Sequence, residues 1–431
     1  MNYLFVFLLL VVSTFTSCTK QQPVSNDPKK PITETNDYSI SINEAILSLE
    51  DFYQQVTKSE SKQVDNIVCV PNPYYNIGTK SSTSDNIAAP NILYVVNYEN
   101  EGGYAILSAD RRLPTEIYAI SDKGEISESD IYDMDYISPA NLVYQSAVRS
   151  IIPGVDTTII DPLLPPGGNP IEPDPFDPPD GEWIVTEWGP WNTVEYIPQM
   201  LITKWHQGSP FNDLVAPNYA GCTPIALFQI IAYNQYPTNY QINRVSIPLS
   251  IMRNLENIST TSMYANAAAV FVKNMHDSYH DSHWENQTLM FPTAAQDYLQ
   301  TIGYSNVQLY RDASECDINI ILSSLRQDYP VMISALANIT SGHSWVIDGY
   351  LKQYRIGEEY GEESGTYFGS KSEERVMVHC NWGWNGSHDG YFYAGVFDIN
   401  SPANVDPTAT QFGSADYYDS YYRIITYEIN N

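Results

Sequence analysis

Near its middle the sequence reads Ala220-Gly-Cys-Thr-Pro-Ile-Ala-Leu-Phe-Gln-Ile-Ile-Ala-Tyr233, a segment that places a cysteine where a helix should begin. Gly221 allows a tight turn, Pro224 suits the first helical turn, and apolar residues follow at helical spacing until Pro237 stops the helix. Unpaired N–H groups at a helix start favour a thiolate over a thiol, so Cys222 is a candidate nucleophile. Taken alone, a cysteine in this position is more often a small core residue.

Length and composition limit the possibilities. The 431 residues are too many for one ordinary domain, so two folded units joined by a linker are expected. Hydrophobic residues make up 43% of the chain, and 34 tyrosines with 8 tryptophans indicate a globular protein rich in β structure. The formal net charge of −30 argues against a nucleic-acid partner, because an acidic surface repels phosphate.

The first 18 residues are typical of an export signal, since the apolar run from Tyr3 to Val12 is too short for a spanning helix. Phe15-Thr-Ser-Cys18 resembles a bacterial lipobox, in which Cys18 becomes the lipidated first residue of the mature chain. Phe15 stands where leucine is usual, and no Lys or Arg precedes the apolar run. We therefore expect an exported chain, anchored through Cys18 at the bacterial outer membrane or cell surface or released after processing. Plain secretion is the alternative.

The other cysteines and the histidines give no clear metal site. Four cysteines remain at wide spacings that match neither a disulfide framework nor a Cys-x-x-Cys pattern, so free thiols are the default expectation: Cys69, Cys222, Cys316 and Cys380. His276 and His280 could share a helix face, but a polar loop is the simpler interpretation of this region. No His-Glu-x-x-His motif occurs. We expect neither a metal nor another cofactor.

The chain divides into segments of different composition. They are a signal peptide (1–18), a polar tether (19–37), a small folded unit (38–152), a linker rich in Pro, Asp and Gly (153–182) and a large folded unit (183–431). In the small unit, apolar spacing predicts a helix after Ser41, short strands at 92–98, 103–108 and 115–120, and a helix at 139–151. This is an α+β unit with an antiparallel meander.

The large unit is also predicted to be α+β. Helices are predicted first, at 222–236, 263–273, 292–302 and 317–327, and strands follow at 331–336, 344–350, 376–381, 390–394 and 421–427. A helical half and an antiparallel β half would then flank one groove.

Cysteine catalysis needs an imidazole, a group that orients it and donors for the oxyanion, and each has a candidate. His343 follows Gly342 at the start of an alternating strand. Asn381 begins Asn381-Trp-Gly-Trp-Asn-Gly386, whose tryptophans can shield an Asn–His hydrogen bond from water. Gln207 precedes Cys222 and could direct its amide at the oxyanion. Judged singly, these are a core histidine, a strand end and a loop residue.

Together they occur in the papain-type order of Gln, Cys, His and Asn, although the local papain signature around the cysteine is missing. Residues 221–237, Gly342-His-Ser-Trp-Val-Ile-Asp-Gly349 and residues 381–392 resemble the three signature blocks of the streptopain family of cysteine peptidases. Trp205-His-Gln-Gly-Ser-Pro-Phe-Asn212 resembles a fourth block, and residues 103–114 are similar to the family's propeptide.

The resemblance implies a papain-like catalytic fold behind a propeptide that inhibits its own enzyme and is cut away, often autocatalytically. It assigns Cys222 as the nucleophile, His343 as the base and Gln207 as the oxyanion donor. Asn381 matches the third catalytic position by order, and its neighbour Trp382 is the alternative support for His343. Three residues would belong to the substrate site: Trp382, Trp384 and Gly342. No cofactor is implied.

Two departures from the family flank the expected groove, so the family's substrate preference does not carry over. Residues 351–375 form a longer and more charged excursion, and the loop between Gln207 and Cys222 is shorter. The expected function is a secreted or lipid-anchored zymogen of a cysteine endopeptidase that acts on proteins or peptides. One alternative is a surface lipoprotein that keeps the fold only for binding, and another is acyl transfer by the same Cys–His pair.

Overall fold

The computed structural model describes residues 38–429 apart from 55–61, 74–89, 133–136, 152–183, 280–281, 285–286, 312–316, 337–341, 362–363 and 398–421. The predicted signal peptide with Cys18, the tether, the linker and Cys316 therefore lie outside the described residues. Within the described part, no helix is both long enough and apolar enough to cross a membrane.

The N-terminal unit folds as the predicted helices and meander, with one further edge strand. Its antiparallel strands are β1 (Val64–Pro71), β2 (Asn91–Tyr98), β3 (Tyr104–Ser108) and β4 (Ile117–Ser121), and its helices are α1 (Ile42–Phe52), α2 (Glu128–Tyr132) and α3 (Pro139–Ser150), with the 3₁₀ turn η3 (Glu99–Glu101). The Ser41 side chain caps α1 by accepting a hydrogen bond from Glu44 N at 3.3 Å. Helices α1 and α3 cover opposite faces of the sheet, each with its own apolar cluster.

The helical half of the large unit surrounds one buried helix, α4 (Cys222–Asn234). Around it lie α5 (Leu249–Met252), α6 (Ala265–Ser278), α7 (Pro292–Thr301) and the small strand pairs β7 (Gln241–Ile242) with β8 (Val245–Ser246) and β9 (Ser282–Trp284) with β10 (Gln287–Leu289). Phe228 of α4 stacks on Phe271 of α6 with ring centroids 4.0 Å apart. Since α4 is buried nearly all round, this packing fixes the position of its first residue, Cys222.

The other half is an antiparallel sheet, as predicted. Its strands are β11 (Ser305–Tyr310), β12 (Val331–Leu336), β13 (Gly342–Gly361), β14 (Tyr367–Asn381), β15 (Gly390–Tyr393) and β16 (Arg423–Glu428), in the spatial order β15-β14-β13-β12-β16-β11. Helix α8 (Ile318–Leu325) and the 3₁₀ turn η5 (Ala394–Val396) pack in the apolar cluster on this sheet. The observed architecture is the predicted α+β fold with a helical half and a β half.

The two units share one continuous sheet. Strand β4 of the N-terminal unit pairs antiparallel with β15, so that Ile120 lies opposite Tyr391 and Ser121 lies opposite Gly390. A Cβ atom on Gly390 would lie 2.1 Å from the carbonyl oxygen of Ile120. Glycine at this position therefore lets the N-terminal unit approach the large unit closely.

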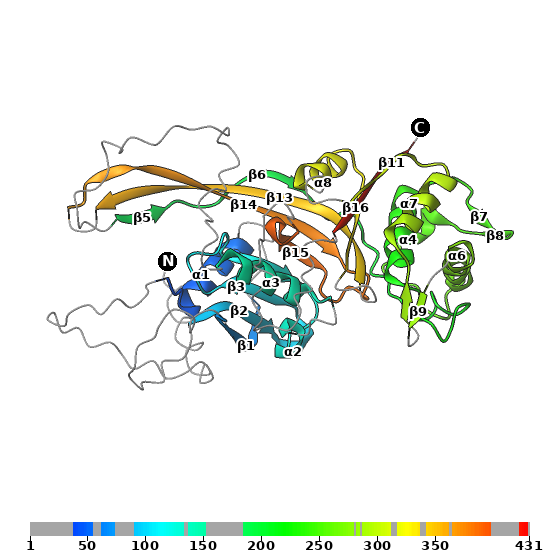
Figure 1. The fold of residues 1–431 in the computed structure, drawn as a ribbon, viewed down its shortest axis with the longest axis horizontal. Helices are drawn as coiled ribbons and strands as arrows, with labels where there is room; N and C mark the ends of the chain where they lie inside the picture. Colours follow the sequence, from blue (N-terminus) through cyan, green and yellow to red (C-terminus); the bar gives the residue numbers. More distant parts are fainter. Residues whose placement is uncertain are drawn as a thin grey trace, which may run out of the picture.

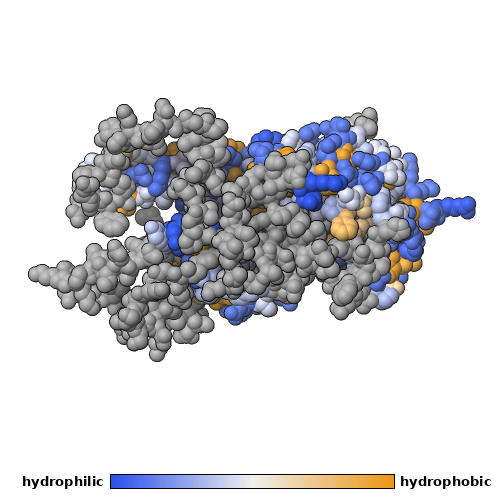
Figure 2. Space-filling view, viewed as in Figure 1, coloured by the Kyte–Doolittle hydropathy of each residue, from blue (hydrophilic) through white to orange (hydrophobic). Residues whose placement is uncertain are grey.

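The excursion at residues 351–375 is an extension of strands β13 and β14. The two strands pair from Val346 opposite Asn381 out to Tyr360 opposite Tyr367. Two further strands, β5 (Ile184–Trp188) and β6 (Asn192–Ile197), pair with the other edge of β13. We call residues 351–377 the arm; it runs past the N-terminal unit and away from α4, α6 and α7 (Figure 1). The part of the described surface seen in Figure 2 is largely hydrophilic.

The cysteines differ from the default expectation at one position. Cys69, in β1, is disulfide-bonded, and its partner is not among the described residues. Cys222 and Cys380 are free thiols, as expected. The expectation of free thiols is therefore wrong for Cys69, because wide spacing in sequence says nothing about proximity in the fold.

Candidate active site

Cys222 is the first residue of α4, as the sequence predicted. Gly221 before it has a φ of 91°, in the left-handed region that favours glycine, and this conformation turns the chain into the helix. Cys222 is partly exposed as a whole residue, whereas the residues that follow it on α4 are buried. The thiol itself is desolvated at the start of this rigid helix.

His343 lies in β13 among three tryptophans. Its ring is 4.5 Å from the Trp384 ring and 6.0 Å from the rings of both Trp345 and Trp382, measured between centroids. Its Nε2 lies 2.8 Å from the backbone carbonyl oxygen of Trp382. Because a carbonyl can only accept, this nitrogen carries the proton of the neutral ring, and Nδ1 is left as the basic nitrogen.

The next residue, Ser344, faces the opposite side of β13, toward the start of α4. Its hydroxyl oxygen lies 2.9 Å from that of Thr223 and 2.8 Å from that of Ser334. Strand β13 thus contacts the nucleophile's helix through Ser344 and the tryptophan cluster through His343. In this conformation no hydrogen bond joins Cys222 and His343, both of which are described residues.

Burial makes both candidate catalytic groups neutral here. Desolvation raises the pKa of the Cys222 thiol, although hydrogen bonds with Ser344 and Thr223 partly oppose the rise. Desolvation also lowers the pKa of His343 to about 4, despite its bond to the Trp382 carbonyl. Both shifts favour the neutral thiol and the neutral imidazole in this conformation.

A reactivity measurement checks this electrostatic state. In the uncut precursor, we expect Cys222 to react slowly with iodoacetamide at pH 7, and the rate to rise about tenfold per pH unit until the raised thiol pKa is reached. Peptide mass spectrometry after timed alkylation measures the rate at this residue. Fast labelling of the precursor that does not change between pH 6 and pH 9 would contradict the expectation.

Asn381 does not orient His343 in this structure. Its Oδ1 accepts hydrogen bonds from Gln229 Nε2 at 3.0 Å and from Gly383 N at 3.1 Å, and its Nδ2 donates to the Thr203 carbonyl at 2.6 Å. In this conformation the Asn381 amide therefore faces α4 and makes no hydrogen bond to His343. The backbone carbonyl of Trp382 makes that contact instead.

Gln207 lies beside the nucleophile. Its carbonyl accepts a hydrogen bond from Ala220 N at 2.9 Å, two residues before Cys222. The block that carries it is anchored by the fully buried Trp205, whose ring is 4.8 Å from Phe228 of α4. Gln207 therefore remains a candidate oxyanion donor.

The other predicted site residues also gather here. Trp384 covers the His343 ring, and Trp382 lies beneath it, fully buried. Gly342 is the first residue of β13 and pairs with Leu336. The two tryptophans thus form a wall next to the candidate base.

Nothing in the sequence assigns Asp389 a catalytic role, but the structure places it behind this wall. Its Oδ1 accepts a hydrogen bond from Trp382 N at 2.8 Å, while its Oδ2 is buried without a partner. The residue thus fixes the backbone whose carbonyl holds His343. Burial raises the pKa of Asp389 to about 7. Its position in the Asn381–Phe392 block was the only signal in the sequence.

A stability profile tests the burial of Asp389. Because its pKa is about 7 in the folded state and about 3.8 ordinarily, the folded state binds the proton more tightly, and stability falls as pH rises from about 4 to 7. We expect Asp389→Asn, which keeps an acceptor for Trp382, to flatten this fall and to raise Tm at pH 8 by several degrees. Some decline should remain, because Asp348 raises the pKa of nearby His379 against the effect of burial. Differential scanning fluorimetry measures the profiles, and parallel curves for both proteins would contradict the expectation.

The N-terminal unit docks on the loop that follows the tryptophans. The Ser121 hydroxyl donates to the Asp389 carbonyl at 2.9 Å, and the Lys123 ammonium donates to the Asn385 carbonyl at 2.9 Å. His388 N in turn donates to the Lys123 carbonyl at 2.9 Å. The N-terminal unit therefore contacts the segment that directly continues the tryptophan wall.

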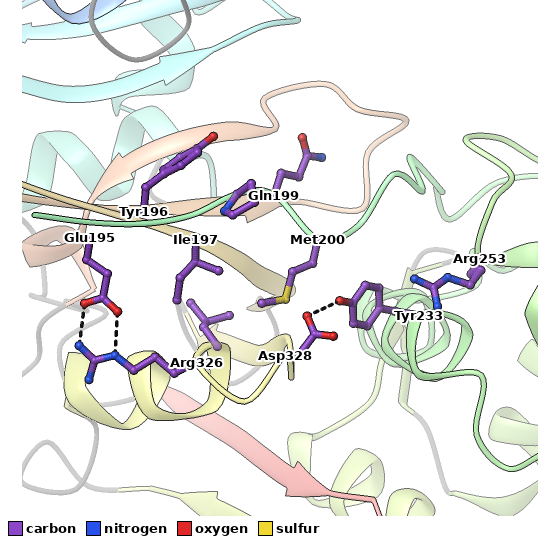
Figure 3. A pocket seen from close by; sticks show the side chains of 11 residues that line it. Glu195, Tyr196, Ile197, Gln199, Met200, Tyr233, Arg253, Arg326 and Asp328 are labelled. Atoms are coloured by element: carbon purple, nitrogen blue, oxygen red, sulfur yellow. Dashed lines mark hydrogen bonds and ion pairs between the residues drawn. The ribbon is translucent and has the colours of Figure 1, made fainter. Parts of the chain in front are cut away.

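No cluster of metal ligands marks a second centre in the described part of the chain. No group of three or more His, Cys, Asp or Glu residues that could hold a metal ion was found among the described residues. His276 contacts the Ala220 carbonyl at 3.0 Å, and His280 is not described. A cavity of about 550 Å³ lies at the far end of α4, where Tyr233 and Asp328 hydrogen-bond and Glu195 pairs with Arg326 (Figure 3). This cavity is separate from Cys222.

Comparisons with known proteins agree with the geometry. Residues 205–392 match the family model described as peptidase C10, and residues 29–135 match that of the Spi protease inhibitor. No curated protein sequence is significantly similar to the chain. Among solved structures, a fragment of prointerpain A from Prevotella intermedia is similar, with a TM-score of 0.49 and 18% identity over 79% of this chain and 96% of that one.

The first match includes the segments that carry Gln207, Cys222, His343 and Trp382, and the second includes α1 and the strands β1 to β4. The order of the two matches is that of an inhibitory propeptide followed by a peptidase. The chain therefore contains a peptidase C10 domain, of the streptopain family of cysteine peptidases, behind a Spi-type inhibitor propeptide domain, which is the arrangement of a cysteine-peptidase zymogen.

Proposed function

We propose that Cys222 and His343 carry out peptide-bond hydrolysis once the propeptide has left. The observation that carries this proposal is the Trp382 carbonyl bound to His343 Nε2, because it leaves Nδ1 free to take the thiol proton. Release of the propeptide would admit water and free the loop beyond Trp384, and Cys222 and His343 would then form the ion pair. The proposed substrates are proteins or peptides.

The reaction would proceed through an acyl-enzyme. The Cys222 sulfur attacks the peptide carbonyl carbon, and the Cys222 backbone N–H and the Gln207 amide stabilise the resulting oxyanion. The protonated His343 gives its proton to the leaving amine as the C–N bond breaks. A water molecule, deprotonated by His343, then attacks the thioester, and the thiol leaves with the returned proton.

Labelling with E-64, an epoxide that alkylates catalytic cysteines, tests this proposal. We expect the matured enzyme to digest casein and to gain one inhibitor mass on the peptide that contains Cys222. Cys380→Ala provides the matched control, because Cys380 is the other free cysteine among the described residues and is buried. This variant should label and digest like the wild type. Absence of both labelling and digestion would overturn the proposal and favour a binding protein that only keeps the fold.

Export and lipidation are a separate part of the proposal and are supported by the sequence pattern alone. The apolar run and the Phe15-Thr-Ser-Cys18 ending favour a signal peptide whose removal leaves a lipidated Cys18. Globomycin should then cause unprocessed precursor to accumulate, and the mature chain should carry a lipid mass that Cys18→Ala abolishes. Mature protein without a lipid mass would favour plain secretion.

A further inference from the structure

The propeptide unit makes a second contact with the peptidase unit, on the arm and away from the tryptophan wall. Arg355, in β13, forms an ion pair with Glu116 of the propeptide unit, with Nη2 and Oε1 2.8 Å apart. The same guanidinium binds Glu373 of β14 through Nε at 2.8 Å. The Arg355 side chain is 11% exposed and that of Glu116 is 28% exposed, so solvent screens this pair only in part.

Two arginine side chains of the arm pack against three aromatic rings. The Arg355 guanidinium lies between the indoles of Trp188 and Trp191, at 4.4 and 4.5 Å from their centroids. The Arg375 guanidinium lies between Trp191, at 4.3 Å, and Phe52 of the propeptide unit, at 5.0 Å. The last ring of this stack therefore belongs to the propeptide.

Arg375 is buried, although it has no carboxylate partner among its hydrogen bonds. Its side chain donates twice to Gln353 Oε1, through Nε at 3.2 Å and Nη2 at 2.7 Å, while Nη1 is buried with no partner. The residue is only 1% exposed. Contact with the Phe52 ring thus covers a charged group that would otherwise be hydrated.

Apolar residues of the arm complete the core of the propeptide unit. Leu351 and Met377 belong to the same buried cluster as Leu49 and Phe52 of α1 and Ile120 of β4. Propeptide and arm therefore share one small core, in addition to the ion pair and the stacked rings.

The arm stays with the peptidase when the linker is cut. Trp188 is the last residue of β5, and Trp191 directly precedes β6; both strands pair with β13 of the peptidase unit. A cut before Ile184 would therefore leave both indoles packed against the arm. Glu116 and Phe52 would be on the other fragment and would leave the arm only when that fragment dissociates.

We propose that the arm is a separate docking site that retains the propeptide after cleavage, so that the enzyme becomes active on dissociation from the arm and not on linker cleavage itself. The inference rests on the proposed function of the Cys222–His343 pair. Two linked contacts, one at β15 and one on the arm, must open together before the propeptide leaves, and each raises the effective concentration of the other. The arm lies outside the family's signature blocks.

The experiment uses full-length Cys222→Ala precursor, nicked in the linker by a glutamate-specific protease and checked by mass spectrometry. By size exclusion we expect the two fragments to elute together for this protein. With Arg355→Gln or Glu116→Gln added, dissociation should be at least tenfold faster and the fragments should separate. Arg326→Gln is the matched control, because Arg326 pairs with Glu195 inside the peptidase unit; its fragments should stay together.

The exchange of Arg355→Glu with Glu116→Arg separates recognition from folding. If the Arg355–Glu116 pair holds the propeptide, a larger fraction of the two fragments should co-elute for the double variant than for either single charge reversal. Glu116→Gln alone leaves the peptidase sequence unchanged, so misfolding of an Arg355 variant would not prevent the test. The same nicked chains with Cys222 restored should stay inactive toward casein until the fragments separate.

The inference would be overturned if the fragments of the precursor with unchanged Arg355 and Glu116 separated immediately after nicking. It would also be overturned if all variants retained the propeptide equally. Failure of the proposed catalytic role would give a different result. Substitutions at Arg355 and Glu116 would still change the co-elution of the fragments, but no chain would digest casein even after the fragments separate.

Discussion

Replacing Cys222 with alanine is expected to lower kcat/KM for peptide hydrolysis by at least about 10⁴-fold, because no acyl-enzyme can form without the sulfur. The purified precursor should also stay uncut. N-terminal sequencing of wild type beside the variant measures the processing, and the wild-type cut is expected between about residues 150 and 183. It should lie before β5, since that strand pairs with the peptidase sheet.

Two controls give this result its meaning. Cys380→Ala removes the second free thiol of the described residues and should process normally. A trace of active wild-type enzyme should cut the Cys222→Ala precursor if the linker is a substrate in trans, and this would show that the variant is folded and cleavable. A cut at the wild-type rate in highly purified variant would contradict the assignment of Cys222 as nucleophile.

The start of α4 and the cap of α1 could be predicted because their signals are local. Gly221 and Pro224 define the beginning of a helix within four residues, and Ser41 with Glu44 does the same for α1. The order of the signature blocks then predicted which segments would meet. Both helices begin where the sequence indicated.

The arm could not be predicted because its pattern of burial is inverted. Gln353 and Arg355 are buried, whereas Ile356 in the same strand is 51% exposed. A strand normally buries its apolar residues, so a segment in which buried polar residues alternate with an exposed apolar one does not indicate a strand. The burial comes from Trp188, Trp191 and the propeptide, which lie far away in the sequence.

The orienting group of His343 was also beyond sequence reasoning. Side chains have identities that a motif can match, so Asn381 was the leading choice by order and Trp382 was the alternative. The structure uses a backbone carbonyl instead, and every residue has one. Which carbonyl points at the ring depends on the turn at residues 381–383, where the Asn381 amide itself binds Gly383 N. Asp389 adds to this arrangement through Trp382 N.

Replacing His343 with alanine is expected to lower kcat/KM by about 10³-fold or more, because the thiol loses both its base and the acid for the leaving amine. The remaining activity should rise with pH as hydroxide generates thiolate, since the pKa of Cys222 is raised. Asn381→Ala is the informative comparison. Its amide binds Gln229, the Thr203 carbonyl and Gly383 N. We therefore expect a lower Tm but a far smaller loss of kcat/KM per folded molecule.

The pH dependence distinguishes a positioning role from a structural one. If the Trp382 carbonyl holds the ring, Asn381→Ala should keep the acid limb of the kcat/KM profile where the wild type has it, because the groups around His343 Nε2 are unchanged. His343→Ala should lose that limb entirely. The opposite result would be a fully folded Asn381→Ala enzyme that loses as much activity as His343→Ala and whose acid limb is displaced. This result would show that the Asn381 amide turns toward His343 once the propeptide has left.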